Sequence, residues 1–504
     1  MNLMHSTFNE INAHGDSLQD FGGMNITRRA ARRREEKGIV TDRVQFLTGR
    51  YAHAMAKPWL LGLVCLFWAG LGARAQSDEG WYTQGDFVPT HRIAVTVSNP
   101  LSIELKDQPV AINRTALPVQ NIPVRSIAVI DPGLPENPEP TQAELRELGG
   151  YVIGKETHGH ALETQVDDLD QDGVWDQIFF LTDLKPRETR KFYIYVDPHE
   201  RGLYPFEVFA ELGDYGRHIV PLFESKVMGW KLWYPGDLDL HGKRNPMLTA
   251  YYELSTNRSG YFMPDSMGTD IMTVRNTFGA GGMCLFEDPS DPENPVRAFY
   301  SPYKDQGPIK DTRYAFDIIC NGPLRSIVKV TTTNWNSGQG SYAYEQYYTV
   351  IAHKSWCKVD VRFTKFLPPN SDVMFGAGIR KIMKEYKSVQ DPGMVISMGK
   401  DIPARIPDED IGTPVLNVGW EGIALVVNKK YHPKYHDMKN YRGNHVFEIP
   451  RTPDLKFEYM VLGGWSFGTV NNDEKSFTDY VRTEQLKYDN PPAIQVGAYE
   501  IKGK

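Results

Sequence analysis

Residues 311–367 decide the fold, because apolar and polar side chains alternate there over four consecutive segments. Side chains of a β-strand point in turn to opposite faces of the sheet, so a period of two indicates strands with one buried face. Turn-forming residues separate the segments, as expected for antiparallel neighbours. The segments are DTRYAFDIIC (311–320), SIVKVTTTNW (326–335), YAYEQYYTVIAH (342–353) and CKVDVRFTKFL (357–367).

The same alternation extends in both directions along the chain. FEYMVLGGW (457–465) repeats it towards the C-terminus, and no helical pattern longer than about three turns stands out. We therefore predict an all-β protein, with a small β-sandwich over residues 81–197 and a large, curved, supersandwich-like catalytic domain over residues 213–504. The segments that define the small sandwich are HRIAVTVSN (91–99), LSIELKD (101–107), RSIAVIDP (125–132), DQIFFLTDL (176–184) and ETRKFYIYVDP (188–198).

Length and composition agree with this division into domains. A chain of 504 residues is too long for one compact core. Its 41% hydrophobic and 24% charged residues are typical of a globular protein rather than a disordered or multispanning membrane protein. The formal net charge of −7 argues against a nucleic-acid partner.

The N-terminal region resembles a processing signal that begins inside the chain. Residues 55–57 (MAK) give a short positive start, residues 59–71 are almost wholly apolar, and residues 73–75 (ARA) form a small-x-small cleavage site. The apolar run is too short for a stable membrane span but suits a secretory signal. We predict a signal peptide at 55–75, a mis-annotated extension at 1–54, and a periplasmic or secreted protein; a permanent anchor is the alternative.

Three cysteines remain after this cleavage site: Cys284, Cys320 and Cys357. Three cannot all pair, and their spacing fits no zinc motif. Their apolar surroundings predict buried free thiols.

The segment 168–176 (DLDQDGVWD) has the spacing of a calcium-binding loop. Carboxylates occupy positions 1, 3, 5 and 9, and glycine occupies position 6, where the loop turns sharply. Position 12 is Phe179 instead of the usual glutamate, so an acidic hairpin with an Asp-Gly turn is the alternative. We predict a structural Ca²⁺ held by Asp168, Asp170, Asp172 and Asp176.

The region from residue 222 to residue 282 mixes acidic, basic and aromatic residues densely. Sugar-binding sites need this mixture, since rings stack on C–H faces, carboxylates accept hydrogen bonds from hydroxyls, and cations hold anionic groups. The alternative is a surface hairpin with ion pairs and packed rings. The residues that we expect to contact substrate here are Glu224, Trp230 and Asp270, with Arg325 and Trp465 from later in the chain.

Several motifs resemble, in order, those of a secreted family encoded in polysaccharide-utilisation loci, most of whose members are known only as a domain of unknown function. The resemblance covers the chain from about residue 92 to the C-terminus. It implies dehydration of a terminal uronic acid on ulvan-type oligosaccharides, which leaves a 4,5-unsaturated uronyl end. The motifs are QVDDLDQDGVWDQIFF (165–180), PLFESKVMGWKLWY (221–234), DLHGKR (239–244), GTDIMTVRNTFGAGG (268–282), NGPLRS (321–326) and GGW (463–465).

Eliminating water from a uronate without a metal or cofactor requires three groups. A cation must neutralise the carboxylate so that the C5 proton becomes acidic, a base must take that proton, and an acid must protonate the departing O4. From the chemistry we assign the cation to Lys243 or Arg244, with Arg325 as a second candidate. His241 or Tyr261 suits the base, and Tyr261, His241 or a neutral Glu224 suits the acid.

Two other classes of function stay open. The protein could be a glycoside hydrolase or polysaccharide lyase acting on the same anionic oligosaccharides. It could also be a carbohydrate-binding protein without catalysis, using the rings of Trp230, Trp233 and Trp465.

Overall fold

A computed structural model gives the structure of the chain. It describes residues 80–82, 88–135, 160–197, 204–215, 218–234, 236–256, 266–272, 274, 277–298, 312–401, 418–440 and 443–504. The predicted signal peptide, the extension before it and Tyr261 lie outside these ranges. The described residues belong to one compact unit within residues 75–504. Antiparallel sheets make up most of this unit, which confirms the all-β fold class.

The small sandwich consists of two sheets whose inner faces share one core. Val95, Val110, Phe180 and Phe192 are buried there, because each strand turns alternate side chains inward. Two 3₁₀ helices, η1 (Arg114–Ala116) and η2 (Val124–Ser126), belong to its connections. One sheet has the order β24-β1-β6-β3 and the other β2-β5-β4. The strands are β1 (His91–Ser98), β2 (Leu105–Asn113), β3 (Ala128–Ile130), β4 (Thr164–Asp167), β5 (Gln177–Leu184), β6 (Thr189–Tyr195) and β24 (Ala493–Ile501).

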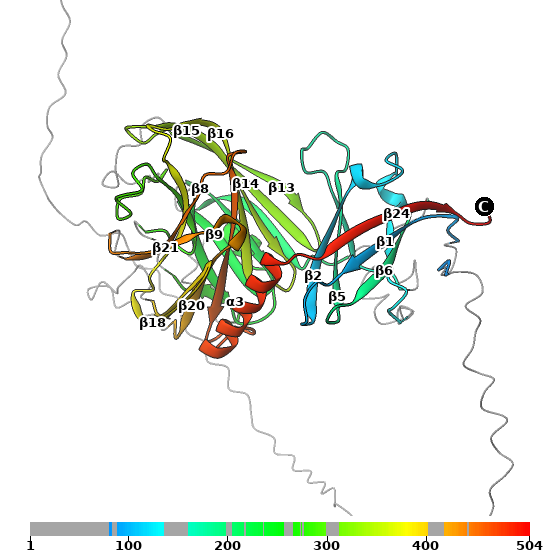
Figure 1. Ribbon diagram of the computed structural model, residues 1–504. Helices are drawn as coiled ribbons and strands as arrows, with labels where there is room; N and C mark the ends of the chain where they lie inside the picture. The colour runs from blue at the N-terminus through cyan, green and yellow to red at the C-terminus, as the bar shows by residue number, and fades with distance from the viewer. Residues whose placement is uncertain are drawn as a thin grey trace, which may run out of the picture. The chain divides into compact units, whose positions relative to one another are not determined.

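The last strand of the chain returns to the small sandwich. β24 pairs antiparallel with β1, with Ser98 opposite Ala493 and His91 opposite Ile501 (Figure 1). The sequence prediction had placed all of 213–504 in the large domain. The predicted end of the large domain therefore has to be corrected, because the C-terminal strand β24 forms the edge of a sheet in the small sandwich.

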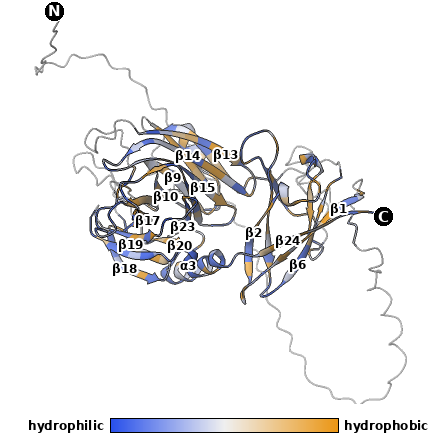
Figure 2. Cartoon of the chain, turned by 45° about the horizontal axis from the view of Figure 1, so that its top comes forward, coloured by the Kyte–Doolittle hydropathy of each residue, from blue (hydrophilic) through white to orange (hydrophobic). Residues whose placement is uncertain are grey.

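The large domain is built on an eight-stranded antiparallel sheet. Its order is β13-β14-β15-β16-β23-β20-β19-β18, and β13 to β16 are the segments that decided the prediction. Hydrophobic and hydrophilic residues alternate along β13 and β14 (Figure 2). The strands are β13 (Arg313–Asn321), β14 (Arg325–Asn336), β15 (Ser341–Ile351), β16 (Trp356–Leu367), β18 (Lys384–Asp391), β19 (Met394–Lys400), β20 (Glu421–Val427) and β23 (Lys456–Trp465).

Two smaller sheets share a continuous core with this large one. The five-stranded sheet, order β11-β10-β9-β8-β7, carries the residues of the candidate site, and the four-stranded sheet has the order β12-β17-β22-β21. A 3₁₀ turn, η5 (Lys429–Tyr431), precedes β21. The strands are β7 (Val208–Tyr215), β8 (His218–Ser225), β9 (Met228–Tyr234), β10 (Asp237–Lys243), β11 (Gly268–Asp270), β12 (Gly282–Phe286), β17 (Met374–Arg380), β21 (Lys434–Met438) and β22 (Asn444–Ile449).

Two α-helices occur in the described part of the chain: α2 (Ala250–Thr256) and α3 (Glu474–Asp489). The sequence analysis missed α3, which begins at a capping box formed by Asp473 and Ser476. Neither helix is long and apolar enough to cross a membrane.

The prediction for the cysteines is confirmed. Cys284, Cys320 and Cys357 are free and buried. Burial raises the pKa of each thiol, and for Cys320 the raised pKa is about 12, so none of the three is poised as a nucleophile.

Candidate functional site

Strand β10 positions the candidate site because its two faces differ in chemistry. Leu238, Leu240 and Gly242 face the large sheet, where Gly463 and Trp465 of β23 pack against them. Gly242 is needed at this point, since any Cβ there would overlap the Trp465 indole. The opposite face carries three buried polar side chains: Asp239, His241 and Lys243. Asp237, which a register irregularity separates from the rest of the strand, pairs with Arg297.

Lys243 and Glu224 anchor helix α2 to the sheet. The Glu224 carboxylate accepts hydrogen bonds from the backbone N–H groups of Thr249 and Ala250, both at 2.6 Å. The Lys243 ammonium pairs with Glu224 and donates to Thr249 Oγ1 at 2.6 Å and to the Met247 carbonyl at 3.2 Å. All three ammonium protons thus have partners, and both side chains are almost wholly buried. This arrangement favours a structural role for the pair over the predicted roles in substrate binding and catalysis.

His241 is held by a glutamate that the sequence analysis did not single out. The His241 Nδ1 atom lies 3.0 Å from the Glu253 carboxylate of α2. Among the described residues, His241 Nε2 has no hydrogen-bond partner, although only 7% of the residue is exposed. Such an arrangement keeps the proton on Nδ1 and leaves Nε2 free to accept one, as a general base requires.

Asp270 faces the free nitrogen of His241. The two residues are paired across β10 and β11, and Asp270 Oδ2 lies 3.7 Å from His241 Nε2. Lys231 of β9 lies between two carboxylates, with its ammonium 3.1 Å from Asp270 Oδ2 and 3.3 Å from Asp239 Oδ2. The sequence analysis had grouped Asp270 and His241 in one dense segment, and the structure brings them together.

The pKa values of both members of this pair are raised. Burial and the neighbouring Asp239 charge raise the pKa of the Asp270 carboxyl to about 7, against the opposing effects of Lys231 and His241. Burial lowers the pKa of His241, but the carboxylates of Glu253 and Asp270 outweigh it, and the net shift is upwards. Two adjacent ionisable groups of this kind can exchange protons with one substrate.

Glu421 of β20 adds a buried carboxyl from a distant part of the sequence. The residue is fully buried, and neither carboxylate oxygen has a hydrogen-bond partner among the described residues. Burial raises its pKa well above the ordinary value, and Asp401, Asp270 and Asp239 contribute in the same direction. We infer that Glu421 is protonated at neutral pH and adds no charge to the cluster.

Arg244 is the predicted cation that remains available for a ligand. Its guanidinium lies 5.2 Å from the centre of the Trp465 ring and 4.8 Å from that of Phe467. The side chain is partly exposed and forms no ion pair with any residue that the structure describes. Trp465 is buried and donates from Nε1 to the Val418 carbonyl at 2.6 Å, so its indole supports Arg244 and is not an open sugar platform.

Two other predicted residues lie away from this cluster. Trp230 is 2% exposed and belongs to the main hydrophobic core, on the face of β9 opposite Lys231. Arg325 pairs with Asp167 of the small sandwich and donates to Gln177 at 2.7 Å. Nothing in these contacts points to substrate binding, and both assignments stay predictions without structural support.

Three atoms of the cluster also have the spacing of a metal site. Ligand atoms of Asp239, His241 and Asp270 lie within 4.8 Å of one another, and carboxylate with imidazole suits a transition metal. The Lys231 ammonium already lies within salt-bridge distance of both carboxylates. A metal ion would have to displace it, so this donor set fits an internal ion pair better than a metal centre.

The acidic loop between β4 and β5 brings together three of the four carboxylates that were predicted to hold calcium. Gly173 adopts a left-handed conformation with φ of 89°, and ligand oxygens of Asp168, Asp170 and Asp176 lie within 4.8 Å of one another. Asp172, the fourth predicted ligand, accepts a hydrogen bond from the Val174 N–H at 2.8 Å and lies outside this set. Three carboxylates around one point suit Ca²⁺, which remains a prediction.

We expect calcium to stabilise the chain through this loop. For a dissociation constant near 0.1 mM, about 10 mM Ca²⁺ should add roughly 2.7 kcal/mol to the free energy of unfolding. Differential scanning calorimetry with and without a chelator measures this, with Asp170→Asn expected to abolish the gain and Asp172→Asn to retain most of it. Identical melting curves in both conditions would leave only the hairpin interpretation.

Comparisons with known proteins place the chain in a family without assigning an activity. No curated protein shows a significant sequence match. Two partly similar solved structures are a protein in the glycosyl hydrolase family 38 from Enterococcus faecalis (10% identity, TM-score 0.43) and an alpha-mannosidase from Enterococcus faecalis V583 (12%, 0.40). Each match covers 82% of this chain but only 48% and 46% of the other chains, so this chain spans about half their length. These TM-scores support no argument about fold or activity.

One family model matches residues 97–494, which include the whole candidate site and all strands of the two domains except most of β1 and β24. The chain therefore belongs to the family described as Domain of unknown function (DUF4861).

Proposed function

We propose that the protein is a carbohydrate-active dehydratase that removes water from the non-reducing-end uronic acid of an ulvan-type oligosaccharide. One observation carries the proposal: His241, oriented by Glu253, presents an unpartnered Nε2 beside the Asp270 carboxyl, whose pKa is raised to about 7. The resemblance of the sequence motifs to a family that contains such an activity supports the choice of reaction and substrate class.

The proposed elimination uses His241 and Asp270 of the cluster together with Arg244, which lies outside the cluster against Trp465 and Phe467. Arg244 neutralises the substrate carboxylate and so stabilises the negative charge that develops when C5 loses its proton. His241 Nε2 accepts this proton, the C4–O4 bond breaks, and Asp270 gives its proton to the departing hydroxide. A C4=C5 double bond and one water molecule result, so atoms and charges balance, and neither a metal nor a cofactor takes part.

The spacing of the two groups favours one stereochemical course. His241 Nε2 and Asp270 Oδ2 are 3.7 Å apart, so both reach the substrate from the same side. We therefore propose a syn elimination. A uronate whose C5 hydrogen and C4 hydroxyl lie on the same face of the ring should be the better substrate.

The rate should depend on pH as a bell-shaped curve. The active form of the pair holds one proton, so kcat/KM should fall on the acidic side when His241 is protonated and on the alkaline side when Asp270 loses its proton. Asp270→Asn should remove the alkaline limb. The acidic limb should persist, because it reports the protonation of His241 beside an uncharged Asp270 and this variant keeps that arrangement. A profile with both limbs unchanged in this variant would contradict the assignment of Asp270.

We also propose that the protein is exported and acts in the periplasm or outside the cell. The proposal rests on the signal-like order of residues 55–75 in the sequence. Sequencing the N-terminus of the exported protein should give a start near Gln76. Material that retains residues 1–54 would contradict the predicted processing.

A further inference from the structure

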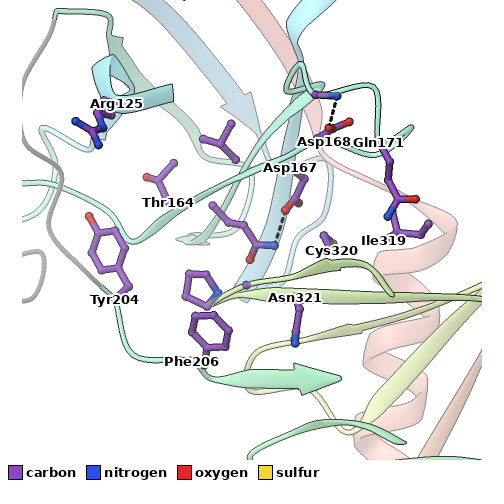
Figure 3. A pocket seen from close by; sticks show the side chains of 15 residues that line it. Arg125, Thr164, Asp167, Asp168, Gln171, Tyr204, Phe206, Ile319, Cys320 and Asn321 are labelled. Carbon is purple, nitrogen blue, oxygen red and sulfur yellow. Dashed lines mark hydrogen bonds between the residues drawn. The ribbon is translucent and has the colours of Figure 1, made fainter. Parts of the chain in front are cut away.

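A cavity lies outside the proposed active site. Its volume is about 900 Å³, within the range of about 300–1,000 Å³ that is typical of small-ligand pockets. Strand β4 and the acidic loop line one side, and the β13–β14 turn (319–323) lines another (Figure 3). No residue of the His241 cluster contributes to it.

Two aromatic rings, those of Tyr204 and Phe206, border the cavity (Figure 3). Phe206 is 41% exposed and lines the cavity. Next to a cavity of this size, an exposed ring offers a surface on which the C–H face of a sugar can stack. The ring is thus positioned to gain buried area when a ligand enters.

Arg125, on the 3₁₀ helix η2, supplies a positive charge to the same cavity. It is exposed and has no ion pair with any residue in the described ranges. Neither acidic residue named in the lining pairs with it: Asp167 pairs with Arg325, and Asp168 accepts hydrogen bonds from the N–H groups of its own loop. Figure 3 shows Arg125 and Gln171 on opposite sides of the cavity.

Hydrogen bonds within the protein hold the polar side chains on the floor of the cavity in place. The Gln165 side chain accepts from the backbone N–H groups of Leu324 and Arg325, both at 2.9 Å, and donates to Asp167 at 2.7 Å. Gln171 donates its amide to the Ile318 carbonyl at 3.3 Å, which leaves its side-chain oxygen to accept from a ligand hydroxyl. A fixed floor with a ring, a cation and a hydroxyl acceptor at its edge has the chemistry of a binding site for an acidic sugar.

We propose that this cavity binds a second segment of acidic oligosaccharide, with Arg125 on a carboxylate or sulfate and Phe206 against a sugar face. The ligand class rests on the proposed function, but binding here does not require turnover. The site would hold a chain near the enzyme while its end is processed at the His241 cluster.

Isothermal titration calorimetry tests this with the full chain carrying His241→Ala, so that the probe is not consumed. The probe is a tetrasaccharide with a terminal uronate, and the control ligand is the same oligosaccharide with its carboxyl groups reduced to alcohols. We expect two binding sites for the acidic probe. Arg125→Ala or Phe206→Ala should each weaken one of them at least about tenfold. Arg451→Ala, an exposed arginine outside the cavity, should change neither.

The carboxyl-reduced probe separates charge from shape. It should bind the cavity more weakly than the acidic probe, and Arg125→Ala should not weaken it further. A single binding site that neither Arg125→Ala nor Phe206→Ala affects would overturn the proposal. That result would leave the dehydratase proposal standing, since the latter is judged by product formation in the protein with His241 intact.

Discussion

Replacing His241 by Ala should lower kcat/KM by about 10² to 10⁴-fold, the range expected when a general base is removed. The structure gives the reason: His241 Nε2 has no hydrogen-bond partner among the described residues, and Glu253 holds the ring from the other side. The rate is followed as the ultraviolet absorbance of the conjugated uronyl product. Circular dichroism and the melting temperature establish that the variant is folded.

His353→Ala is the matched control, because His353 also pairs with a carboxylate, Asp107, at 2.9 Å but is about half exposed and lies outside the cluster. It should keep the rate of the unmodified protein. If His241→Ala leaves the protein folded and fully active, the cluster is structural and the base lies elsewhere, with Tyr261 the other candidate.

Glu253→Gln distinguishes a base from a merely buried histidine. The amide oxygen can still accept the Nδ1 proton, so the ring stays oriented, but the negative charge that raises the pKa of His241 is lost. The acidic limb of the kcat/KM profile should therefore move to lower pH while the fold persists. A purely structural hydrogen bond would change the melting temperature and leave the pH profile where it was.

Replacing Arg244 by Ala should cost on the order of 2–4 kcal/mol of transition-state stabilisation. This expectation follows from a guanidinium that lies against Trp465 and Phe467 and has no acidic partner in the described part of the chain. The loss should appear in kcat as well as kcat/KM, because the negative charge on the substrate grows in the transition state. Arg244→Lys should restore part of the rate, since a lysine keeps the charge but loses the planar fork.

Lys243→Met is the informative comparison for Arg244. Removing the ammonium leaves the Glu224 carboxylate buried without its cation, which should cost about 3–5 kcal/mol of stability. At a temperature where the variant is folded, it should turn over substrate at a rate close to that of the unmodified protein. If a folded Lys243→Met protein loses turnover while Arg244→Ala keeps it, then Lys243, and not Arg244, neutralises the substrate carboxylate.

The sequence predicted the strands well because their patterning is local. Period-two alternation over 313–366 is visible in any window and corresponds to β13 to β16. Helix α3 was missed because two of its four buried residues, Glu484 and Gln485, are polar, which interrupts the apolar stripe expected every third or fourth position. Strand β24 was assigned to the wrong sheet because its pairing with β1 spans nearly the whole chain, and most of its side chains are exposed.

The candidate site was predictable only where its residues are close in sequence. Glu224, His241, Lys243 and Asp270 come from one dense segment, and the structure places them on neighbouring strands. The sequence did not indicate a role for Glu253, because a single glutamate on a short helix is usually a surface residue. Glu421 reaches the cluster from β20, and no local pattern links it to residues about 150 positions earlier. Trp230 was predicted to bind substrate only because it lies in a segment rich in charged and aromatic residues. The alternation of side chains along β9 instead points it into the hydrophobic core.

The central claim, elimination of water at an acidic sugar end, is tested most directly by mass spectrometry of the product. Oligosaccharides with a saturated glucuronate or iduronate at the non-reducing end, with and without sulfate, are incubated with the protein, and absorbance and chain length are followed together. The account predicts a product lighter by one water, with rising ultraviolet absorbance and no shortening of the chain. Shortened chains with absorbance would indicate a lyase, and new reducing ends without absorbance a hydrolase. Unchanged mass across all these substrates would contradict the dehydratase.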